Sequence, residues 1–316
     1  MGDRNDALIE SLPEAESKLG GASPEFAGYL TAVGQTLYHD SRFDDALPIL
    51  KKALDIREKS LAVDHPDIGK SLNNLATVFL AQGQYVQAEP LFKKALVIQE
   101  RASGAEHVNT AAAMNNLAEL YRAIGKFTLA EPLYKRALEL RVRHLGENDL
   151  DVANVLNNLG MLYYDQGSNS EAEPYFRRVL SIQETVLGTD HPAIANTLNN
   201  LAKLFSERDQ FESAEPLHLR ALAIREKVLS TEHPKVAESL NNLGWLYHQK
   251  GSYARAESLY QRALEIWEST LGPDHANVAT CLENYAALLY KTNREIDAVA
   301  LEQRVHMIRT KCAEEF

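Results

Sequence analysis

The sequence repeats itself every 42 residues, and this period limits the possible folds more than any other feature. Seven consecutive repeats, numbered 1 to 7, occupy residues 23–64, 65–106, 107–148, 149–190, 191–232, 233–274 and 275–316. A fixed period of this length is typical of proteins in which one supersecondary unit stacks on the next. We therefore expect a continuous, one-dimensional core that is built from contacts between neighbouring repeats.

Each repeat carries two apolar stripes of helical period. The first stripe of repeat 2 consists of Ile68, Leu72, Leu75, Ala76 and Phe79. Gly83 then interrupts the pattern, and the second stripe runs from Tyr85 to Leu96. A single hairpin of two helices cannot bury both stripes, so neighbouring hairpins must cover them. The pattern predicts an all-α protein, a solenoid of seven helical hairpins.

The two ends of the array differ from the repeats between them. Residues 1–22 are predicted to form an N-terminal capping helix, a degenerate half repeat, because "LGGASPEF" matches the "LGTDHPAI" that joins later repeats. In repeat 7, Glu302 and His306 stand where repeat 2 has Phe92 and Leu96. Polar residues at these core positions suit a final helix whose outer side has no neighbour.

The spacing of the large apolar residues, the small residues and the glycine in each repeat resembles that of the tetratricopeptide repeat. In repeat 2 it is carried by Leu72, Leu75, Ala76, Phe79, Gly83, Tyr85, Ala88, Phe92 and Ala95. The 42-residue length, with "HPDIGKSLNNLA" and "AEPLYKRALELR", is similar to the repeats of the kinesin light chain family and related bacterial and eukaryotic proteins. The resemblance implies that the solenoid is a right-handed superhelix whose first helices line a concave groove. It also implies a non-enzymatic interaction scaffold.

Pairs of asparagines recur in the middle of the predicted first helices. Asparagine is a mediocre helix former, so its regular return calls for a reason. The positions are Asn73 and Asn74, Asn115 and Asn116, Asn157 and Asn158, Asn199 and Asn200, Asn241 and Asn242, and Asn284 alone in repeat 7. At 100° per residue, the first asparagine of a pair is predicted to point into the groove. The second is predicted to lie at its edge, close to the next first helix.

An array of amides in register has two interpretations. An amide offers donors and an acceptor, so a row of them can pair with the backbone of an extended peptide whatever its side chains are. In the peptide-binding relatives implied by the resemblance, the residue that matches Asn74 often has this role. Alternatively, the amides form hydrogen bonds between neighbouring first helices. We favour contact with a ligand, and both roles can coexist.

Positions that vary between repeats would give such a groove its specificity. The candidates on the same helix face are Arg122, Tyr164, Lys203, Trp245, His248 and Tyr290. The aromatic residues among them gather in the second half of the array, which favours an apolar anchor in the partner. Acidic residues such as Glu207 lie near Lys203, so we expect no cluster of cations for a strongly acidic peptide.

Several kinds of chemistry find no support in the sequence. The histidines that open five repeats are one repeat apart, about 10 Å for packed helices, which is too far for shared zinc ligation at about 2.1 Å. They are His65, His107, His191, His233 and His275, and we expect them to cap helices. No common catalytic or nucleotide-binding motif occurs, so no cofactor is expected. The two cysteines, Cys281 and Cys312, belong to no metal or redox motif.

Composition narrows the range of partners. The net charge of −11 disfavours nucleic acid, and no apolar run is long enough for a membrane span. We expect a cytoplasmic protein that binds a protein or peptide partner, with its oligomeric state left open. Two alternatives remain. One is an architectural or self-associating array that docks a folded partner on its convex face, and the other is a sensor of peptides or metabolites that regulates a partner enzyme.

Overall fold

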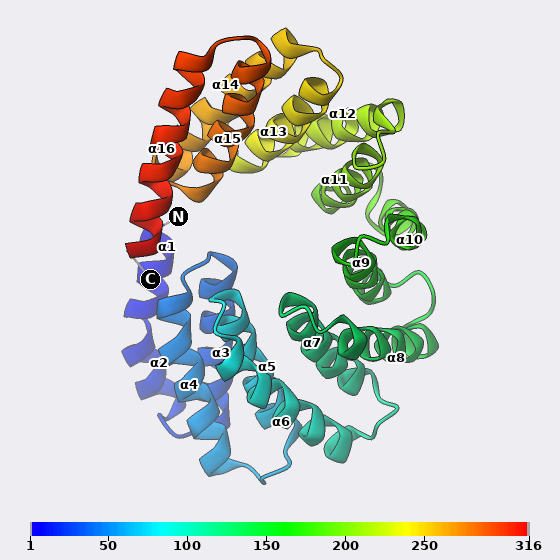
Figure 1. Ribbon diagram of the computed structural model, residues 1–316. Coiled ribbons are helices and arrows are strands. Elements are labelled where there is room, and N and C mark those ends of the chain that lie inside the picture. Colours follow the sequence, from blue (N-terminus) through cyan, green and yellow to red (C-terminus); the bar gives the residue numbers. More distant parts are fainter. Residues whose placement is uncertain (1, 315–316) are drawn as a thin grey trace. The chain divides into compact units, whose positions relative to one another are not determined.

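The computed structural model describes the backbone of residues 2–314 and the side chains of residues 6–311. Every regular element in this range is an α-helix (Figure 1). The first nine are α1 (Gly2–Glu10), α2 (Leu12–Leu19), α3 (Pro24–His39), α4 (Phe43–Ser60), α5 (Pro66–Ala81), α6 (Tyr85–Ser103), α7 (Val108–Ala123), α8 (Phe127–Leu145) and α9 (Leu150–Asp165). The others are α10 (Asn169–Leu187), α11 (Pro192–Ser206), α12 (Phe211–Val228), α13 (Pro234–Gln249), α14 (Tyr253–Leu271), α15 (Ala276–Lys291) and α16 (Glu295–Glu314).

The helices form two compact parts, which are described separately. The N-terminal part comprises Met1–Gln166 and the C-terminal part comprises Gly167–Phe316. In the N-terminal part the hairpins are α3–α4, α5–α6 and α7–α8, and in the C-terminal part they are α11–α12, α13–α14 and α15–α16. Each hairpin also packs on the next one in its own part. The predicted solenoid of helical hairpins is thus confirmed.

Proline and histidine fix where the first helices begin. Pro66 occupies the first turn of α5, where its missing N–H costs no hydrogen bond, and the same holds for Pro24, Pro192 and Pro234. The residue before each first helix of repeats 2, 3, 5, 6 and 7 is a histidine. Its Nδ1 accepts a hydrogen bond from the backbone N–H two residues later, at 3.1 to 3.2 Å. The predicted capping role is confirmed for all five histidines.

The cap of repeat 6 provides a direct test of this role. In repeat 4 the same position is Asp149, whose Oδ1 accepts from the N–H of Asp151 at 2.7 Å. Replacing His233 with aspartate is expected to raise the free energy of unfolding by about 0.5 kcal/mol, because a carboxylate also interacts favourably with a helix N-terminus. His233→Ala is expected to lower it by about 1 kcal/mol. Urea titrations measure both, and an alanine variant as stable as the wild type would contradict the capping role.

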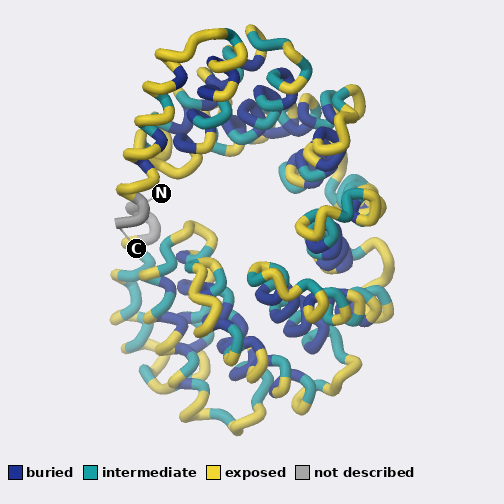
Figure 2. The backbone as a smooth tube through the Cα atoms, viewed as in Figure 1, coloured by how far each residue is buried: buried dark blue, intermediate teal, exposed yellow. Residues whose placement is uncertain are grey.

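The core lies between the helices of each hairpin and between neighbouring hairpins (Figure 2). One position of the second helix is aromatic and fully buried in repeats 2, 3, 4 and 6, where it is Phe92, Tyr134, Phe176 and Tyr260. Burial of each such ring contributes about 2 to 3 kcal/mol. Repeat 5 has His218 at this position. In repeat 7 the equivalent Glu302 is exposed, as is His306, which is the pattern predicted for a terminal helix.

A buried arginine connects repeats 5 and 6. Arg225, near the end of α12, is only 1% exposed. Its guanidinium donates to the carbonyl of Lys235 at 2.7 Å, to Ser239 Oγ at 2.9 Å, to Asn196 Oδ1 at 2.7 Å and to Glu238 Oε1 at 3.1 Å. The side chain therefore ties the start of α13 to α11 and α12. The same position alternates between arginine and glutamine along the first four repeats, as Arg57, Gln99, Arg141 and Gln183.

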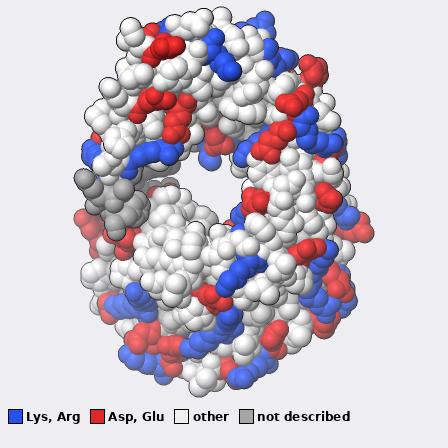
Figure 3. Space-filling model, viewed as in Figure 1, with Lys and Arg blue, Asp and Glu red and all other residues white. Residues whose placement is uncertain are grey.

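Charged side chains of both signs are interspersed over the face of the molecule that Figure 3 shows. Many are paired between successive second helices, as in Lys94 with Glu58 at 2.9 Å and Arg262 with Glu226 at 2.8 Å. Exposed pairs of this kind contribute little to stability. Among the described residues no group of histidine, cysteine and acidic side chains could hold a metal ion, and no helix there has the length and apolar character that a membrane span requires. The side chain of Cys281 is buried, and that of Cys312 lies outside the described residues.

Candidate functional site

The asparagine pairs lie where successive first helices contact one another. Such contacts join α5 with α7, α7 with α9, α11 with α13, and α13 with α15. The first asparagine is buried in four of the five pairs, with exposures between 6% and 9% for Asn73, Asn115, Asn199 and Asn241. The second is half-buried in every pair. The first asparagine is therefore less accessible than predicted, because neighbouring helices cover most of it, and the second is the more exposed of the two.

Two of these amides link neighbouring repeats directly. Asn158 Nδ2 donates to Asn115 Oδ1 at 3.0 Å, and Asn284 Nδ2 donates to Asn241 Oδ1 at 3.1 Å. In both cases the second asparagine reaches back to the first asparagine of the preceding repeat. The alternative of bonds between first helices is thus confirmed for these two rungs. Since an amide group has two donor hydrogens and two lone pairs, each second asparagine keeps capacity for another partner.

The remaining second asparagines differ in their contacts. Asn74 Oδ1 accepts from Gln35 Nε2 at 3.4 Å, and Asn116 Oδ1 accepts from Asn115 Nδ2 at 3.4 Å. Asn200 also has an interaction partner, and so has Asn157, the first asparagine of its pair. The side chain of Asn242 forms no hydrogen bond with another described residue. Its amide is therefore the one most available to a ligand.

The variable positions are placed less uniformly than the sequence suggested. Arg122 forms an ion pair with Asp165 at 2.5 Å, which occupies part of its guanidinium. The hydroxyl of Tyr290 donates to Glu302 Oε2 at 2.7 Å, and this bond is the main cause that raises the pKa of Tyr290. The ring of His248 meets that of Tyr253 edge-on, with 5.9 Å between the centroids, and burial lowers the pKa of His248. Tyr164 is half-buried and Lys203 is exposed.

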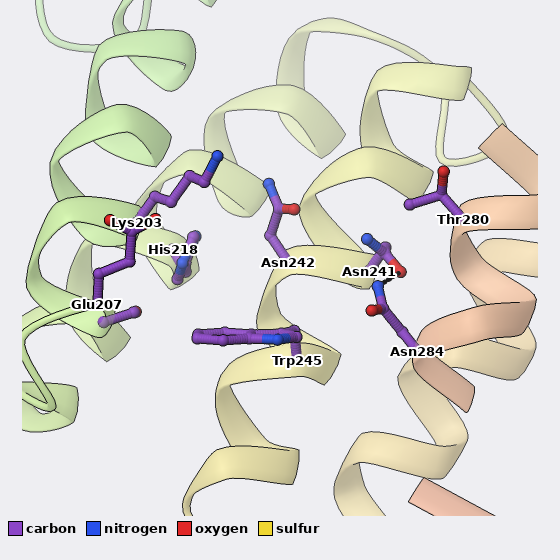
Figure 4. A pocket seen from close by; sticks show the side chains of 9 residues that line it. Lys203, Glu207, His218, Asn241, Asn242, Trp245, Thr280 and Asn284 are labelled. Carbon is purple, nitrogen blue, oxygen red and sulfur yellow. Dashed lines mark hydrogen bonds between the residues drawn. The ribbon is translucent and has the colours of Figure 1, made fainter. Parts of the chain in front are cut away.

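A cavity of about 240 Å³ brings several predicted residues together in the C-terminal part (Figure 4). It is lined by residues of α11, α12, α13 and α15, so three repeats contribute. The lining consists of Lys203, Ser206, Glu207, His218, Asn241, Asn242, Trp245, Thr280 and Asn284. Figure 4 shows the indole of Trp245 edge-on, with His218 on one side and the bonded Asn241 and Asn284 on the other. We call this the repeat 5–7 cavity.

The sequence prediction included five of these residues and missed four. It placed Lys203, Asn241, Asn242, Trp245 and Asn284 on the groove side of first helices. It did not choose Ser206, Glu207, His218 or Thr280 as ligand contacts, although Ser206 is one of the variable groove positions and Glu207 was expected near Lys203. One available signal was His218, because it stands where other repeats have Phe or Tyr. The other predicted residues of the same part do not line this cavity; they are Asn199, Asn200, His248 and Tyr290.

The imidazole of His218 is held in one protonation state. Its Nδ1 lies 3.0 Å from Asn199 Oδ1, and because that oxygen can only accept, Nδ1 carries the hydrogen. The side chain is 2% exposed. Burial, together with the positive charge of Arg225, lowers the pKa of His218 to about 4. At pH 7 the ring is therefore neutral, and Nε2 presents a lone pair that can accept a hydrogen bond.

Two buried polar atoms, one on the residue that bonds to this ring and one on a residue that lines the same cavity, have no hydrogen-bond partner among the described residues. They are Ser206 Oγ and Asn199 Nδ2. Ser206 is 2% exposed and lines the cavity. Buried polar atoms in native proteins nearly always have a partner, because leaving one unpaired costs about 1 to 3 kcal/mol. Of the residues that line the cavity, Ser206 therefore offers a hydroxyl and His218 an imidazole nitrogen that can accept a hydrogen bond.

An equivalent but smaller cavity occurs between repeats 1 and 2. Its volume is about 140 Å³. The two cavities correspond through Gln35 with Lys203, Tyr38 with Ser206, His39 with Glu207, Leu50 with His218, Asn74 with Asn242, and Thr77 with Trp245. The same place in the array is thus hollow in both parts, and the side chains at variable positions set its size and polarity.

Comparison with known proteins gives the family of the chain. A family model described as tetratricopeptide repeat matches residues 25–101, 70–141, 151–227, 207–266 and 246–311, and a second model of that description matches residues 115–185. No curated protein matches the sequence. Solved structures with the same fold include kinesin light chain-like proteins, as the sequence resemblance implied.

Three such structures illustrate the likeness. BtubC (BKLC) from P. vanneervenii is 24% identical, with a TM-score of 0.59 over 84% of this chain and 93% of that one. A putative kinesin light chain from P. anserina with nearly identical TPR-like repeats is 26% identical, with a TM-score of 0.57 over 65% and 98%. The Rap conjugation gene regulator of plasmid pLS20, in complex with the Phr* peptide, is 16% identical, with a TM-score of 0.65 over 90% and 74%. Given matches along nearly its whole length, the chain belongs to the tetratricopeptide-repeat family.

Proposed function

We propose that this protein is a non-enzymatic scaffold that binds an extended segment of a partner protein along its first helices. The observation that carries the proposal is the amide of Asn242. It is half-buried, it lines the repeat 5–7 cavity together with Lys203 and Trp245, and it forms no hydrogen bond with another described residue. A donor and an acceptor held ready beside an aromatic ring suit the recognition of a peptide.

In this proposal the two asparagines of a pair have different roles. The buried first asparagine, such as Asn241, accepts a hydrogen bond from the next repeat and keeps the first helices in register. The second asparagine, such as Asn242, contacts the ligand. Packed helices lie roughly 8 to 10 Å apart, and an extended chain advances about 3.3 Å per residue. Successive second asparagines would therefore meet the backbone of an extended peptide at roughly every third residue.

The likeness to solved structures agrees with this mode of binding but does not identify a ligand. The Rap regulator of plasmid pLS20, whose structure contains the Phr* peptide, has the same fold. In the present chain the choice of ligand would come from the side chains at variable positions, among them Lys203 and Trp245.

Replacing Asn242 with alanine tests the proposal. Peptides selected from a library of short linear sequences by the wild-type chain are expected to bind the variant about tenfold more weakly, because two hydrogen bonds to the peptide backbone are lost. The melting temperature should not change, since this amide bonds to no other described residue. Isothermal titration measures the affinity and calorimetry the melting temperature.

Asn284→Ala is the matched control. It removes a bond to Asn241 in the same cavity, so it is expected to lower the free energy of unfolding by about 1 kcal/mol as well as to weaken binding. If Asn242→Ala binds the selected peptides as tightly as the wild type, the proposed role of the second asparagines is wrong. Failure of the wild type to select any peptide would favour the architectural alternative, which sedimentation and cross-linking can then examine.

A further inference from the structure

The repeat 5–7 cavity has a small side chain, Ser206, at a position that is larger in every other repeat. At the equivalent position the chain has tyrosine in three other repeats, namely Tyr38, Tyr164 and Tyr290. In the smaller cavity between repeats 1 and 2, Tyr38 itself forms part of the lining. The volume rises from about 140 Å³ there to about 240 Å³ beside Ser206. The space that opens lies where this fold elsewhere carries the phenol ring of its own tyrosine.

The polar atoms around this space select for a hydroxyl group. Ser206 Oγ is buried without a partner, and it can donate or accept. Nε2 of His218 can only accept, because Nδ1 carries the hydrogen that Asn199 receives. A phenol hydroxyl can donate to Nε2 and accept from the serine hydroxyl at the same time. It therefore satisfies both atoms.

Other aromatic groups fit these atoms less well. A benzyl group would leave Ser206 Oγ and His218 Nε2 unpaired. An indole N–H could donate to the imidazole but could accept nothing from the serine. A phosphate would bring acceptor oxygens to the lone pair of Nε2, at a rim that carries both Lys203 and Glu207 and offers no arginine. A ligand without the hydroxyl leaves buried polar atoms of the site unpaired, and the cost of these unpaired atoms rejects even a close analogue.

The side wall of the cavity provides the apolar contact. Trp245 is half-buried, and its indole borders the space beside His218 (Figure 4). Aromatic rings that stack or meet edge-on gain about 0.5 to 1.5 kcal/mol beyond their buried area. The other first helices have no tryptophan at this position. The large ring and the small serine occur together only at this junction of repeats.

We infer that the repeat 5–7 cavity binds the side chain of an unmodified tyrosine, with the phenol hydroxyl between Ser206 and His218 and the ring against Trp245. The inference rests on the proposed function in one respect, since a segment of the partner would supply the tyrosine. Asn242 and Asn284 lie on the same cavity and would hold the backbone beside that residue. Phosphorylation of the tyrosine would then release the partner.

The probe is N-acetyltyrosinamide, which carries the side chain between two backbone amides and has no charge. Saturation-transfer NMR with the full chain measures its affinity against the phenylalanine, tryptophan and O-phosphotyrosine analogues. The tyrosine amide is expected to bind about fivefold more tightly than each of the other three, as the loss of one hydrogen bond to a buried partner implies. Equal binding of the phenylalanine amide, or no detectable binding of the tyrosine amide, would overturn the inference.

Two substitutions at one position separate binding from folding. Ser206→Ala removes the unpaired hydroxyl, so affinity for the tyrosine amide should fall about fivefold while the melting temperature stays the same or rises. Ser206→Tyr is expected to fill the cavity as Tyr38 does in the smaller one, and to abolish binding. Ser213→Ala, at an exposed serine of α12, serves as the control with wild-type affinity. A Ser206→Ala variant with reduced stability and unchanged affinity would show that the serine is structural.

The failure of this inference can be told apart from the failure of the proposed function. If selected peptides bind the first helices but Ser206→Tyr leaves their affinity unchanged, peptide binding stands and the tyrosine site is wrong. If the tyrosine amide binds and Ser206→Tyr abolishes that binding, the site stands even where Asn242→Ala has no effect on peptides. The two sets of variants thus give independent answers.

Discussion

Replacing Arg225 with alanine is expected to lower the free energy of unfolding by about 3 to 4 kcal/mol. The side chain is 1% exposed. It forms hydrogen bonds with one residue of α11 and three residues of α13. Its removal leaves Ser239 Oγ and the carbonyl of Lys235 without this donor and creates a cavity where the long side chain was. Buried unpaired groups cost about 1 to 3 kcal/mol each, and the cavity adds to that.

Urea-induced unfolding of the full chain measures this loss, and two variants serve as references. Arg225→Gln is expected to lose about half as much, because Gln99 and Gln183 occupy the same position in other repeats and keep the methylene contacts. Arg220 lies on the same helix as Arg225 and forms a surface ion pair with Glu184 of α10. Arg220→Ala removes this pair and should lower the free energy of unfolding by less than about 1 kcal/mol. If Arg225→Ala were no more destabilised than Arg220→Ala, the buried guanidinium would not be what joins repeats 5 and 6.

Acidification should destabilise the protein through His218, by about 3 kcal/mol between pH 7 and pH 4. The pKa of this side chain falls from 6.5 in the unfolded chain to about 4 in the folded one, mainly because of burial. Between these two values the unfolded state binds more protons, so stability decreases as the pH falls through this window. One pKa unit corresponds to about 1.4 kcal/mol, which gives the expected size of the effect.

The difference between the wild type and His218→Phe isolates this contribution. Phenylalanine occupies the equivalent position in repeats 2 and 4, as Phe92 and Phe176, so the variant is expected to fold. Other titrating groups are common to both chains and cancel. Unfolding free energies from urea titrations at a series of pH values should diverge below about pH 6.5 and run parallel below pH 4. Parallel curves over the whole range would mean that His218 is not held neutral by the fold.

The course of the chain was predictable because each determinant is local and recurs. Pro66 and the histidine before it start a first helix, Gly83 ends it, and Tyr85 begins the second helix as expected. The apolar stripes predicted which residues would be buried, down to the exposed Glu302 of the terminal helix. Repetition strengthens such a prediction, since a signal that is weak in one repeat returns in the next.

The site was less predictable, because it depends on how one repeat meets another. A helical wheel gives the direction of Asn241 about its own helix, but it does not show that a neighbouring first helix covers that direction. The consequence is that the first asparagines are less accessible than predicted. The role of His218 was not predictable for a related reason. Its partner Asn199 and the residues that line the cavity with it, Ser206 and Trp245, lie on other helices, and the sequence alone does not show that these helices meet.

The repeat 5–7 cavity also has a consequence for how such arrays acquire new ligands. Its wall comes from Trp245 of repeat 6 and its floor from Ser206 and His218 of repeat 5, and none of these side chains alone disturbs the stacking of the hairpins. In the proposed site, ligand specificity would therefore depend on which repeats are neighbours and not on any one repeat alone. Duplication or exchange of whole repeats could create or erase a recognition site in one step while every hairpin keeps its fold.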